Sequence, residues 1–590
     1  MARIIALLLL TTTVVFYCPA QTIPHERTVD WSLVGLNNGI QDYQNAVNIE
    51  DYGGTGDGST SNNGAFLSAI NSLNNTPGVI LFNEGTYLFD QVINLPDNTI
   101  IRGKGAELTT LKFTASGDLI QAKGTIENQE TNVIQSAEKE QNYLVLESNH
   151  SFNPGDFILL TLNDDTLVTS TWALRSVGQI NTIDSIHLDT IFLKKPLRMD
   201  YPLSSSPWIK KIIPRKNTGI ECLRILRGSN DNFQSNNILF EYCVESWVKG
   251  IESDSCNYAH IAISNSSNIE VRNSFFHNAY SYGNGGKGYG VMIHMTSGEC
   301  LVENNIFKQL RHAMILQAGA NGNVFGYNYS LSPYWTEVSL PSGSAGDMVL
   351  HGNYAYANLF EGNIGQNIVI DDSHGKNGPY NTFFRNRAQH YGIFMNNAPA
   401  SDRQNIVGNE VTNTGLTLGL YLLFGTDHFL HGNIVKGVVN PSGTQALPEA
   451  SYYHPFPPAF LSNIGLFPAI GTPLAYNSGT NAAKTNYLAG IYSYCHADIP
   501  PSSVGIEQHK QDSPVTIYPN PSTGIIHVQL NKKNNENSTI HIYDLSGTLV
   551  HSTALSAQEE ILTISSLKAG FYLVHITFEG KLYVEKIYKQ

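Results

Sequence analysis

The segment 371–387, DDSHGKNGPYNTFFRNR, holds the densest group of ionisable side chains in a chain that is only 14% charged. Carboxylates could act as acid and base, a histidine could transfer protons near neutral pH, and cations could neutralise an acidic substrate. The segment is therefore a candidate active site. Its candidate catalytic residues, together with a histidine from a neighbouring repeat, are His351, Asp371, Asp372, His374, Arg385 and Arg387.

Five short apolar runs in this part of the chain each end in a polar residue. These runs are VMIH, MILQ, MVLH, IVID and IFMN, and they end at His294, Gln317, His351, Asp371 and Asn396. If the runs are stacked strands, the polar residues form one column. A structural ladder would suit the Gln and the Asn, but two histidines and an aspartate are costly to bury without partners. We therefore favour a groove over a ladder.

Further candidates lie close to these runs or in the insertions 280–290 and 332–346, which interrupt the pattern and could form walls. Tyr334 and Trp335 in the second insertion could stack on sugar rings. The residues expected to bind substrate are His294, Arg311, His312, Gln317, Trp335, Asp347, Lys376, His390 and Asn396. Arg385 and Arg387 flank Asn386, so strand alternation predicts that both point outward if the asparagine faces the core.

Lyase chemistry on a uronate needs a cation for the carboxylate, a base for the C5 proton and an acid for the leaving oxygen. Arg385, Arg387 or Lys376 could supply the cation. His351, His374, or an arginine or lysine could supply the base. β-Elimination of an acidic polysaccharide is the reaction that we expect.

Two other functions remain open. A hydrolase needs two carboxylates, and Asp371 with Asp372 or Asp347 could provide them. A non-catalytic glycan-binding or adhesive protein would keep stacking aromatics but would not need an ionisable column. Asp371 and Asp372 could also hold Ca²⁺, although no set of metal ligands is specific enough to name a site, and no other cofactor is indicated.

The strongest signal about the scaffold is a repeat of about 23 residues. The phrases NIEVRN, CLVENN, NVFGYN, NLFEGN, NTFFRN, QNIVGN and HFLHGN recur, closing at Asn273, Asn305, Asn328, Asn363, Asn386, Asn409 and Asn433. Each unit has room for three short strands, which predicts an all-β chain built as a right-handed parallel β-helix. The asparagines would then stack at one turn and hydrogen-bond between coils.

The segment 51–70, DYGGTGDGSTSNNGAFLSAI, resembles the opening of pectate-lyase-like β-helix proteins. In that family a glycine-rich turn precedes a short helix that caps the coil. Here Asn62 or Asn63 could be the N-cap, and Phe66, Ile70 and Leu73 would plug the core. The resemblance covers residues 45–500 and implies a fold shared by polysaccharide lyases, glycoside hydrolases and phage tailspikes, with a polysaccharide as partner.

The two ends of the chain predict export. Residues 1–20 have a basic residue, an apolar run and small residues before the cut, as in a signal peptide, although Cys18 could instead accept a lipid. Residues 515–590 alternate apolar and polar positions, which predicts a small antiparallel β-sandwich after a linker at 501–514. This part resembles the C-terminal sorting domain of the type IX secretion system of Bacteroidota. The resemblance implies the type IX machinery as a partner and a secreted or cell-surface protein.

Composition excludes several function classes. The net charge of −14 argues against nucleic acid and anionic membranes as partners, and no later segment is apolar enough to span a membrane. Five cysteines follow the predicted signal peptide, without the CxxC spacing typical of zinc sites. One or two disulfides would be compatible with export, and the odd number leaves at least one free thiol.

Overall fold

The computed structural model describes most of the chain. The described ranges are 22–231, 234–283, 285–336, 341–461, 466–472, 476–495, 515–519, 522–530, 538–544, 549–555, 557–568, 570–578 and 581–589. The chain divides into two compact units, Met1–Ser503 and Val504–Gln590. The predicted signal peptide at 1–20 and linker at 501–514 lie outside the described residues. Within the described part, no helix is both long enough and apolar enough to cross a membrane.

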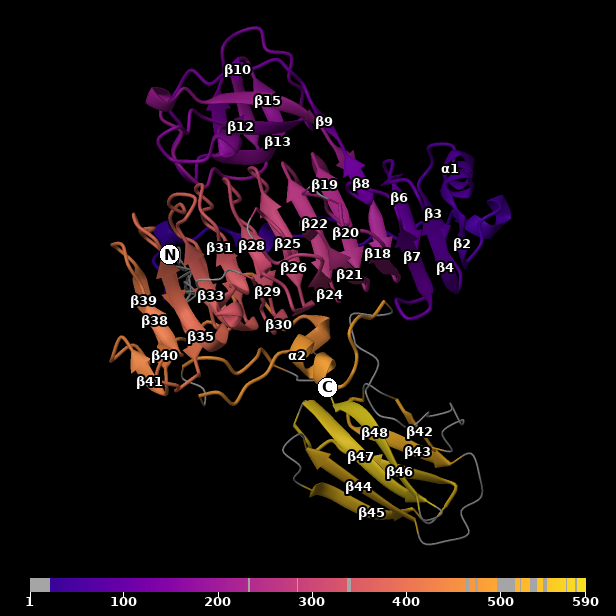
Figure 1. Cartoon of the computed structure of the whole chain (residues 1–590). Coiled ribbons are helices and arrows are strands. Elements are labelled where there is room, and N and C mark those ends of the chain that lie inside the picture. Colours follow the sequence, from indigo (N-terminus) through magenta and orange to yellow (C-terminus); the bar gives the residue numbers. More distant parts are fainter. Residues whose placement is uncertain are drawn as a thin grey trace, which may run out of the picture. The chain divides into compact units, whose positions relative to one another are not determined.

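The first unit is the predicted parallel β-helix, and its stacked strands are visible in Figure 1. Each coil contributes one strand to a first parallel sheet and two strands to a second, so the strands form three rows. The first row is β1 (Ala46–Asn48), β3 (Gly78–Leu81), β6 (Thr99–Arg102), β17 (Gly219–Glu221), β20 (Cys243–Lys249), β23 (Ser267–Arg272), β26 (Leu301–Glu303), β29 (Val324–Gly326), β32 (Leu359–Glu361), β34 (Thr382–Phe384), β36 (Asn405–Val407) and β39 (Phe429–His431).

The other two rows belong to the second sheet. The second row is β2 (Asp57–Ser61), β4 (Gly85–Phe89), β7 (Thr109–Phe113), β18 (Arg224–Arg227), β21 (Glu252–Cys256), β24 (Phe275–Ala279), β27 (Ile306–Lys308), β30 (Tyr329–Leu331), β33 (Ile364–Asp371), β35 (Arg387–Asn396), β37 (Glu410–Val411) and β40 (Asn433–Val435). The third row is β5 (Ile93–Asn94), β8 (Ile120–Lys123), β19 (Ile238–Glu241), β22 (Ala259–Ser264), β25 (Tyr289–His294), β28 (His312–Leu316), β31 (Met348–Leu350), the later parts of β33 and β35, and β38 (Leu420–Leu422).

Stacked apolar residues fill the inside of the coil. Phe325, Phe360 and Phe383 occupy the same position in three successive coils, and their rings stack with centroids 5.3 and 4.9 Å apart. At the first end of the coil, α1 (Asn63–Ser72) caps this core, as the sequence predicts. Phe66 packs on the aromatic core, and Leu73 is buried with it.

The asparagine ladder forms, with one correction to its register. Six asparagines on successive coils are linked by five steps, and in each step the Oδ1 atom of one asparagine accepts hydrogen bonds from both the backbone N–H and the side-chain amide of the preceding one. They are Asn305, Asn328, Asn363, Asn386, Asn409 and Asn433. The prediction for Asn273 is wrong, because Ser274 occupies the equivalent position and Asn273 pairs with Asn304. A second ladder, which the sequence analysis missed, runs through Asn323, Asn358, Asn381 and Gln404.

The prediction of an uninterrupted β-helix over residues 45–500 is wrong at 125–213, and also after Asn440, where the described residues up to 495 add no further strand to it. At 125–213 the chain leaves the coil and forms a seven-stranded antiparallel sheet, drawn above the β-helix in Figure 1. We call this part the inserted subdomain; its strands are β9 (Thr125–Ile126), β10 (Thr131–Asn132), β11 (Tyr143–Val145), β12 (Phe157–Thr161), β13 (Gly178–His187), β14 (Thr190–Leu193) and β15 (Trp208–Ile213). Apolar and polar residues alternate along these strands as they do along the strands of a coil. The hydrophobic pattern alone could therefore not distinguish the inserted subdomain from the β-helix.

After β41 (Val438–Asn440), which folds antiparallel onto β40, the described residues between 441 and 495 run back along the β-helix toward its earlier coils. We call them the return segment. It contacts Arg385 through Leu447, Glu303 through His454, and Gly250 through Cys495. Helix α2 (Ala482–Leu488) lies in it, and the N-cap side chain of Asn481 also donates to the carbonyls of Asn328 and Gly362.

The second unit is the antiparallel β-sandwich that the sequence predicts. One sheet orders β42 (Val515–Tyr518), β43 (Ile525–Leu530) and β46 (Glu559–Thr563); the other orders β45 (Leu549–Leu555), β44 (Ser538–Asp544), β47 (Gly570–Phe578) and β48 (Lys581–Lys589). Alternate residues of both sheets, such as Val528, Ile540 and Val574, form a separate core. This unit has its own hydrophobic core, as an independent domain requires.

Candidate active site

A cavity of ≈ 1220 Å³ lies over the ends of the third-row strands. The parallel register of these strands brings Asp371 beside Asn396, and places His351 and Gln317 on the coils before them. All five residues of the predicted column line the cavity: His294, Gln317, His351, Asp371 and Asn396. We call them the open column.

At the centre of the open column, His351 and Asp371 form a close pair. The Nδ1 atom of His351 lies 2.5 Å from Oδ2 of Asp371. Ser373 holds the carboxylate from the other side, because its backbone N–H donates to Oδ1 and its hydroxyl to Oδ2, both at 2.9 Å. Burial alone would raise the pKa of Asp371, but the hydrogen bonds from His351 and Ser373 lower it. The aspartate therefore stays ionised and fixes the orientation of the histidine.

Two more histidines contact this pair, and a third, His294, lies two coils further along the open column. The ring of His374 meets that of His351 edge-on at 4.8 Å, and His312 lies 5.3 Å from His351 on the other side. Burial lowers the pKa of His374, His312 and His294, the last to about 4. These rings are therefore neutral near pH 7, which keeps their nitrogens available for hydrogen bonds with a neutral or anionic group.

Several polar atoms of the cavity wall are buried without a hydrogen-bond partner among the described residues. They are Nδ1 of His294, Nε of Arg311, Nε2 of His312 and Oδ1 of Asn396. A folded protein rarely leaves so many buried polar atoms unpaired unless a ligand or solvent satisfies them. Their concentration at one place indicates a site for a polar ligand.

Arg311 is the only lysine or arginine among the described residues that line the cavity. Its guanidinium stacks against Tyr289 and Trp335, with distances of 5.8 and 5.5 Å to the ring centroids. Nη1 donates to the carbonyl of Gly283, in the insertion 280–290, at 2.7 Å. The two predicted insertions thus hold this cation at the wall, where it can meet an acidic group.

The other two aspartates of the prediction do not reach the cavity. Asp372 turns to the opposite side and accepts hydrogen bonds from Ser401 and Asn377. Asp347 accepts from the hydroxyl of Ser330 and from the backbone N–H of residues 366 and 367. Burial raises the pKa of each to about 6. The open column therefore contains a single carboxylate, that of Asp371.

The expectation that Arg385 and Arg387 face outward is wrong. Arg385 has a φ of 51°, so it sits in a turn between β34 and β35 and strand alternation does not apply to it. Its guanidinium is buried and donates to four carbonyls of the return segment, at Leu447, Glu449, Ile470 and Thr472. Arg387 is 2% exposed and pairs with Glu410 at 2.6 Å. Arg385 therefore fastens the return segment to the β-helix, and Arg387 links its coil to the next one.

Two further predicted residues also lie apart from the cavity lining. Lys376 forms an ion pair with Asp402 at 2.8 Å. His390 packs on the ring of Tyr391, 4.5 Å between centroids, and only the tyrosine lines the cavity.

Trp172, which was not predicted from the sequence, reaches the cavity from the inserted subdomain. The residue is 48% exposed, and its ring lies 6.4 Å from that of His374. The segment that carries it is fixed to the β-helix, since the side chain of Asn353 accepts from the backbone of Thr169 and Ser170. No local pattern could have found Trp172, because it precedes the members of the open column by 122 to 224 residues and lies outside the repeat.

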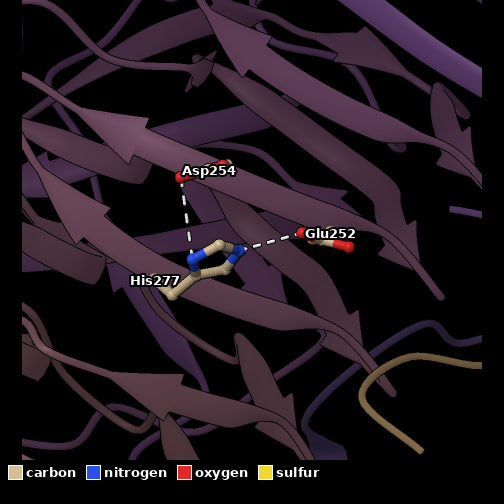
Figure 2. Close-up of side chains that lie close together, drawn as sticks. All are labelled: Glu252, Asp254 and His277. Carbon is tan, nitrogen blue, oxygen red and sulfur yellow. Dashed lines mark hydrogen bonds and ion pairs between the residues drawn. The ribbon is translucent and has the colours of Figure 1, made fainter. Parts of the chain in front are cut away.

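Among the described residues, one group has the spacing of a metal site, and it lies outside the cavity. Figure 2 shows Glu252 and Asp254 of β21 with His277 of β24 between them, at 3.0 and 3.6 Å. Arg224 of the neighbouring strand also contacts both carboxylates, at 3.4 and 2.5 Å. A guanidinium already supplies the positive charge that a metal would bring, so we interpret the group as a structural ion-pair network.

Comparison with known proteins agrees with the two units. Residues 46–153 match the family described as Rhamnogalacturonase A/epimerase, pectate lyase-like, and residues 516–590 match the secretion system C-terminal sorting domain. No curated protein matches the chain significantly. The chain therefore carries a pectate-lyase-like β-helix domain and a C-terminal sorting domain.

Solved structures resemble the first unit in fold. The tailspike protein of Pseudomonas phage LKA1 has a TM-score of 0.50 at 15% identity, with 62% of this chain and 64% of the tailspike covered. The tailspike of Pseudomonas phage phi297 has a TM-score of 0.42 at 15% identity, covering 69% and 83%. An exopolygalacturonase from Thermotoga maritima has a TM-score of 0.32 at 12% identity, covering 67% and 80%. The chain thus spans less than two thirds of the LKA1 tailspike.

Proposed function

We propose that this pectate-lyase-like protein is an exported enzyme that cleaves an acidic polysaccharide by β-elimination in the cavity of the open column. The observation that carries the proposal is the pair of His351 and Asp371, 2.5 Å apart, in a cavity whose wall includes Arg311. Such a pair provides a base, and the arginine provides a cation for the acidic group of the sugar.

In this mechanism His351 is the base. Asp371 holds Nδ1, so the Nε2 atom is left to take the proton from C5 of the uronate ring. The electrons of that C–H bond form a double bond between C4 and C5, and the bond from C4 to the glycosidic oxygen breaks. The imidazolium can then return the proton to the leaving oxygen if both lie on the same face of the ring.

Arg311 neutralises the uronate carboxylate. The C5 proton becomes acidic enough to abstract only when the negative charge developing on the carboxylate is stabilised. Arg311 has an unpaired Nε and is fixed by Gly283 and the two aromatic rings, so it can bind a carboxylate without reorganising. This role replaces the one that the sequence analysis gave to Arg385, Arg387 or Lys376.

The hydrolase alternative has less support. It needs two carboxylates facing one glycosidic bond, and Asp372 and Asp347 are engaged in hydrogen bonds away from the cavity. A glycan-binding protein without activity would not need an ionised aspartate aligned on a histidine. These contrasts favour proton abstraction over both alternatives.

The test is to incubate the full chain with a panel of acidic and neutral polysaccharides. A lyase produces chain ends with a C4–C5 double bond, which absorb in the ultraviolet, and this absorbance should require His351. Reducing ends without ultraviolet absorbance would indicate a hydrolase. Deuterium uptake at C5 without cleavage would indicate an epimerase, and binding without any turnover would indicate an adhesive protein.

A further inference from the structure

Two cysteines from distant parts of the chain meet on the first sheet. Cys222 follows β17 directly, and Cys495 lies at the end of the described return segment. The neighbouring thiol of Cys495 and burial together raise the pKa of Cys222. The sulfur of Cys495 also lies 3.5 Å from the carbonyl of Gly250, on the coil next to that of Cys222.

The other described cysteines have different surroundings. The thiols of Cys243, Cys256 and Cys300 are buried, and each donates to a backbone carbonyl, at Ala122, Tyr289 and Gly298 respectively. Cys495 is only partly buried, so a reagent can reach its sulfur. Among the described thiols, Cys222 and Cys495 are thus the pair with a partner sulfur and an approach from solvent.

We propose that Cys222 and Cys495 become oxidised to a disulfide during export, which fastens the return segment to an early coil. The oxidant is a disulfide-carrying thiol oxidoreductase of the compartment outside the inner membrane. The Cys495 thiolate attacks a sulfur of that disulfide and releases one of its thiolates. Cys222 then attacks the sulfur of Cys495 and releases the second. Two protons and two electrons leave the chain, and the oxidant becomes a dithiol.

The bond would close a loop of ~270 residues, for which the loss of entropy in the unfolded chain is large. The bond would also lie where a mechanical force on the chain can be expected. Cys495 precedes the sorting domain at 516–590 by about 20 residues in the sequence, so a pull on that domain during export would pass along the chain to the return segment before it reached the coils. The disulfide would stop the return segment from peeling away from the carbonyl contacts of Arg385 and the pair of Glu303 with His454.

The inference is tested on the full chain purified after export. Alkylation in denaturant without reductant should label three of the five mature cysteines, and a non-reduced digest should contain one peptide that links Cys222 to Cys495. Labelling of all five cysteines, or a link between other residues, would overturn the inference. Cys300→Ala serves as the matched control, because it should leave the linked peptide unchanged.

Stability gives a second, independent readout. Cys222→Ser, Cys495→Ser and the double variant should all lower the Tm by the same amount, ~5 °C or more, since each removes one and the same bond. Reductant should lower the wild-type Tm to that level and leave the variants unchanged. A Tm loss in Cys222→Ser that is absent in Cys495→Ser would mean that Cys222 contributes by packing and would count against the disulfide.

Discussion

Two columns of polar residues run along this β-helix, and they differ in what covers them. The open column lies at the ends of the third-row strands and faces the cavity. A second column, which we call the covered column, lies at the ends of the first-row strands in register, through Glu221, Lys249, Arg272, Glu303 and Glu361. Both contain ionisable side chains at a fixed point of the repeat, so their sequence patterns are of the same kind.

The return segment pairs with two members of the covered column, Glu303 and Glu361, whereas Glu221 accepts hydrogen bonds from Arg102 and Trp247 of the β-helix itself. Glu303 accepts from His454 at 2.6 Å and from the hydroxyl of Tyr453 at 3.0 Å. Glu361 accepts from the backbone N–H of Tyr452 at 2.8 Å. In the open column, by contrast, His294 and Asn396 keep buried atoms without a described partner. An ionisable column therefore indicates a site only where no other part of the chain pairs with it.

The largest expected effect is on the central pair of the open column. His351→Ala should lower kcat by ~10²–10⁴-fold, because it removes the proposed base, and it should change the Tm little. Glu303→Ala, in the covered column, should instead lower the Tm and keep the kcat of the folded fraction. Steady-state kinetics with thermal denaturation separates the two. Exposed His187, on the inserted subdomain, supplies the control variant His187→Ala. Full activity in His351→Ala would show that His351 is not the base and that the proposed mechanism is wrong.

The comparison also explains what could be predicted from sequence. The repeat and the phase of the polar column are local properties, so the β-helix, the ladder from Asn305 to Asn433 and the open column could be predicted. The orientation of Arg385 could not, since it depends on a return segment about 60 to 90 residues later in the chain. Trp172 is likewise placed by contacts between segments that share no pattern. Contacts with segments that are distant in the sequence therefore decide which polar residues face solvent.

Arg385 and Arg311 allow a residue paired with the return segment to be compared with one that faces the cavity, using a single residue type. Arg385→Met should destabilise the protein by ~2–3 kcal/mol, because the buried carbonyls that it satisfies would lose their donors, and it should leave KM unchanged. Arg311→Met should raise KM or lower kcat on the acidic substrate and leave the free energy of unfolding nearly unchanged. Denaturant titration and kinetics of both variants provide the measurement. If Arg311→Met were fully active, its proposed contact with the uronate would be wrong.

The ladder residue Asn363 should behave like the covered column. Its side chain is fully buried and donates to Asn386 and to the carbonyl of Phe325, while its Oδ1 accepts from Asn328. Asn363→Ala should cost ~1–3 kcal/mol of unfolding free energy, because the partners remain buried and unpaired. Chemical denaturation should show this loss with unchanged kcat per folded molecule. A loss of kcat at full stability would contradict the structural role.

The covered column should also give stability a pH dependence. Burial alone would lower the pKa of His454, but Glu303 raises it above its usual 6.5; burial alone would raise the pKa of Glu303, but His454 lowers it below its usual 4.5. A raised histidine pKa stabilises below 6.5, and this stability is lost as the pH rises through the folded value. A lowered carboxyl pKa stabilises above 4.5, and this stability is lost on acidification.

The pair should therefore contribute most between about pH 4.5 and 6.5 and less at higher pH. Glu303→Gln keeps the shape of the side chain and removes its charge, so its Tm deficit relative to wild type should be larger at pH 6 than at pH 9. A deficit that grows on going from pH 6 to pH 9 would mean that the coupling to His454 has the opposite sign.

The smallest expected effect concerns Trp172, where the inserted subdomain meets the open column. Trp172 is held at the cavity although about half of the residue is exposed, which is unfavourable for a tryptophan unless a ligand covers it. We expect one sugar ring of the substrate to stack on it. Trp172→Ala should then raise KM by ~3–10-fold, since a stacking contact contributes ~0.5–1.5 kcal/mol, with kcat nearly unchanged because the central pair is intact.

Leu174→Ala removes an exposed apolar side chain from the same segment outside the cavity lining and should leave both constants unchanged. Equal effects of the two substitutions would show that the segment acts only by packing, and the inserted subdomain would then be a cover for the β-helix that takes no part in binding.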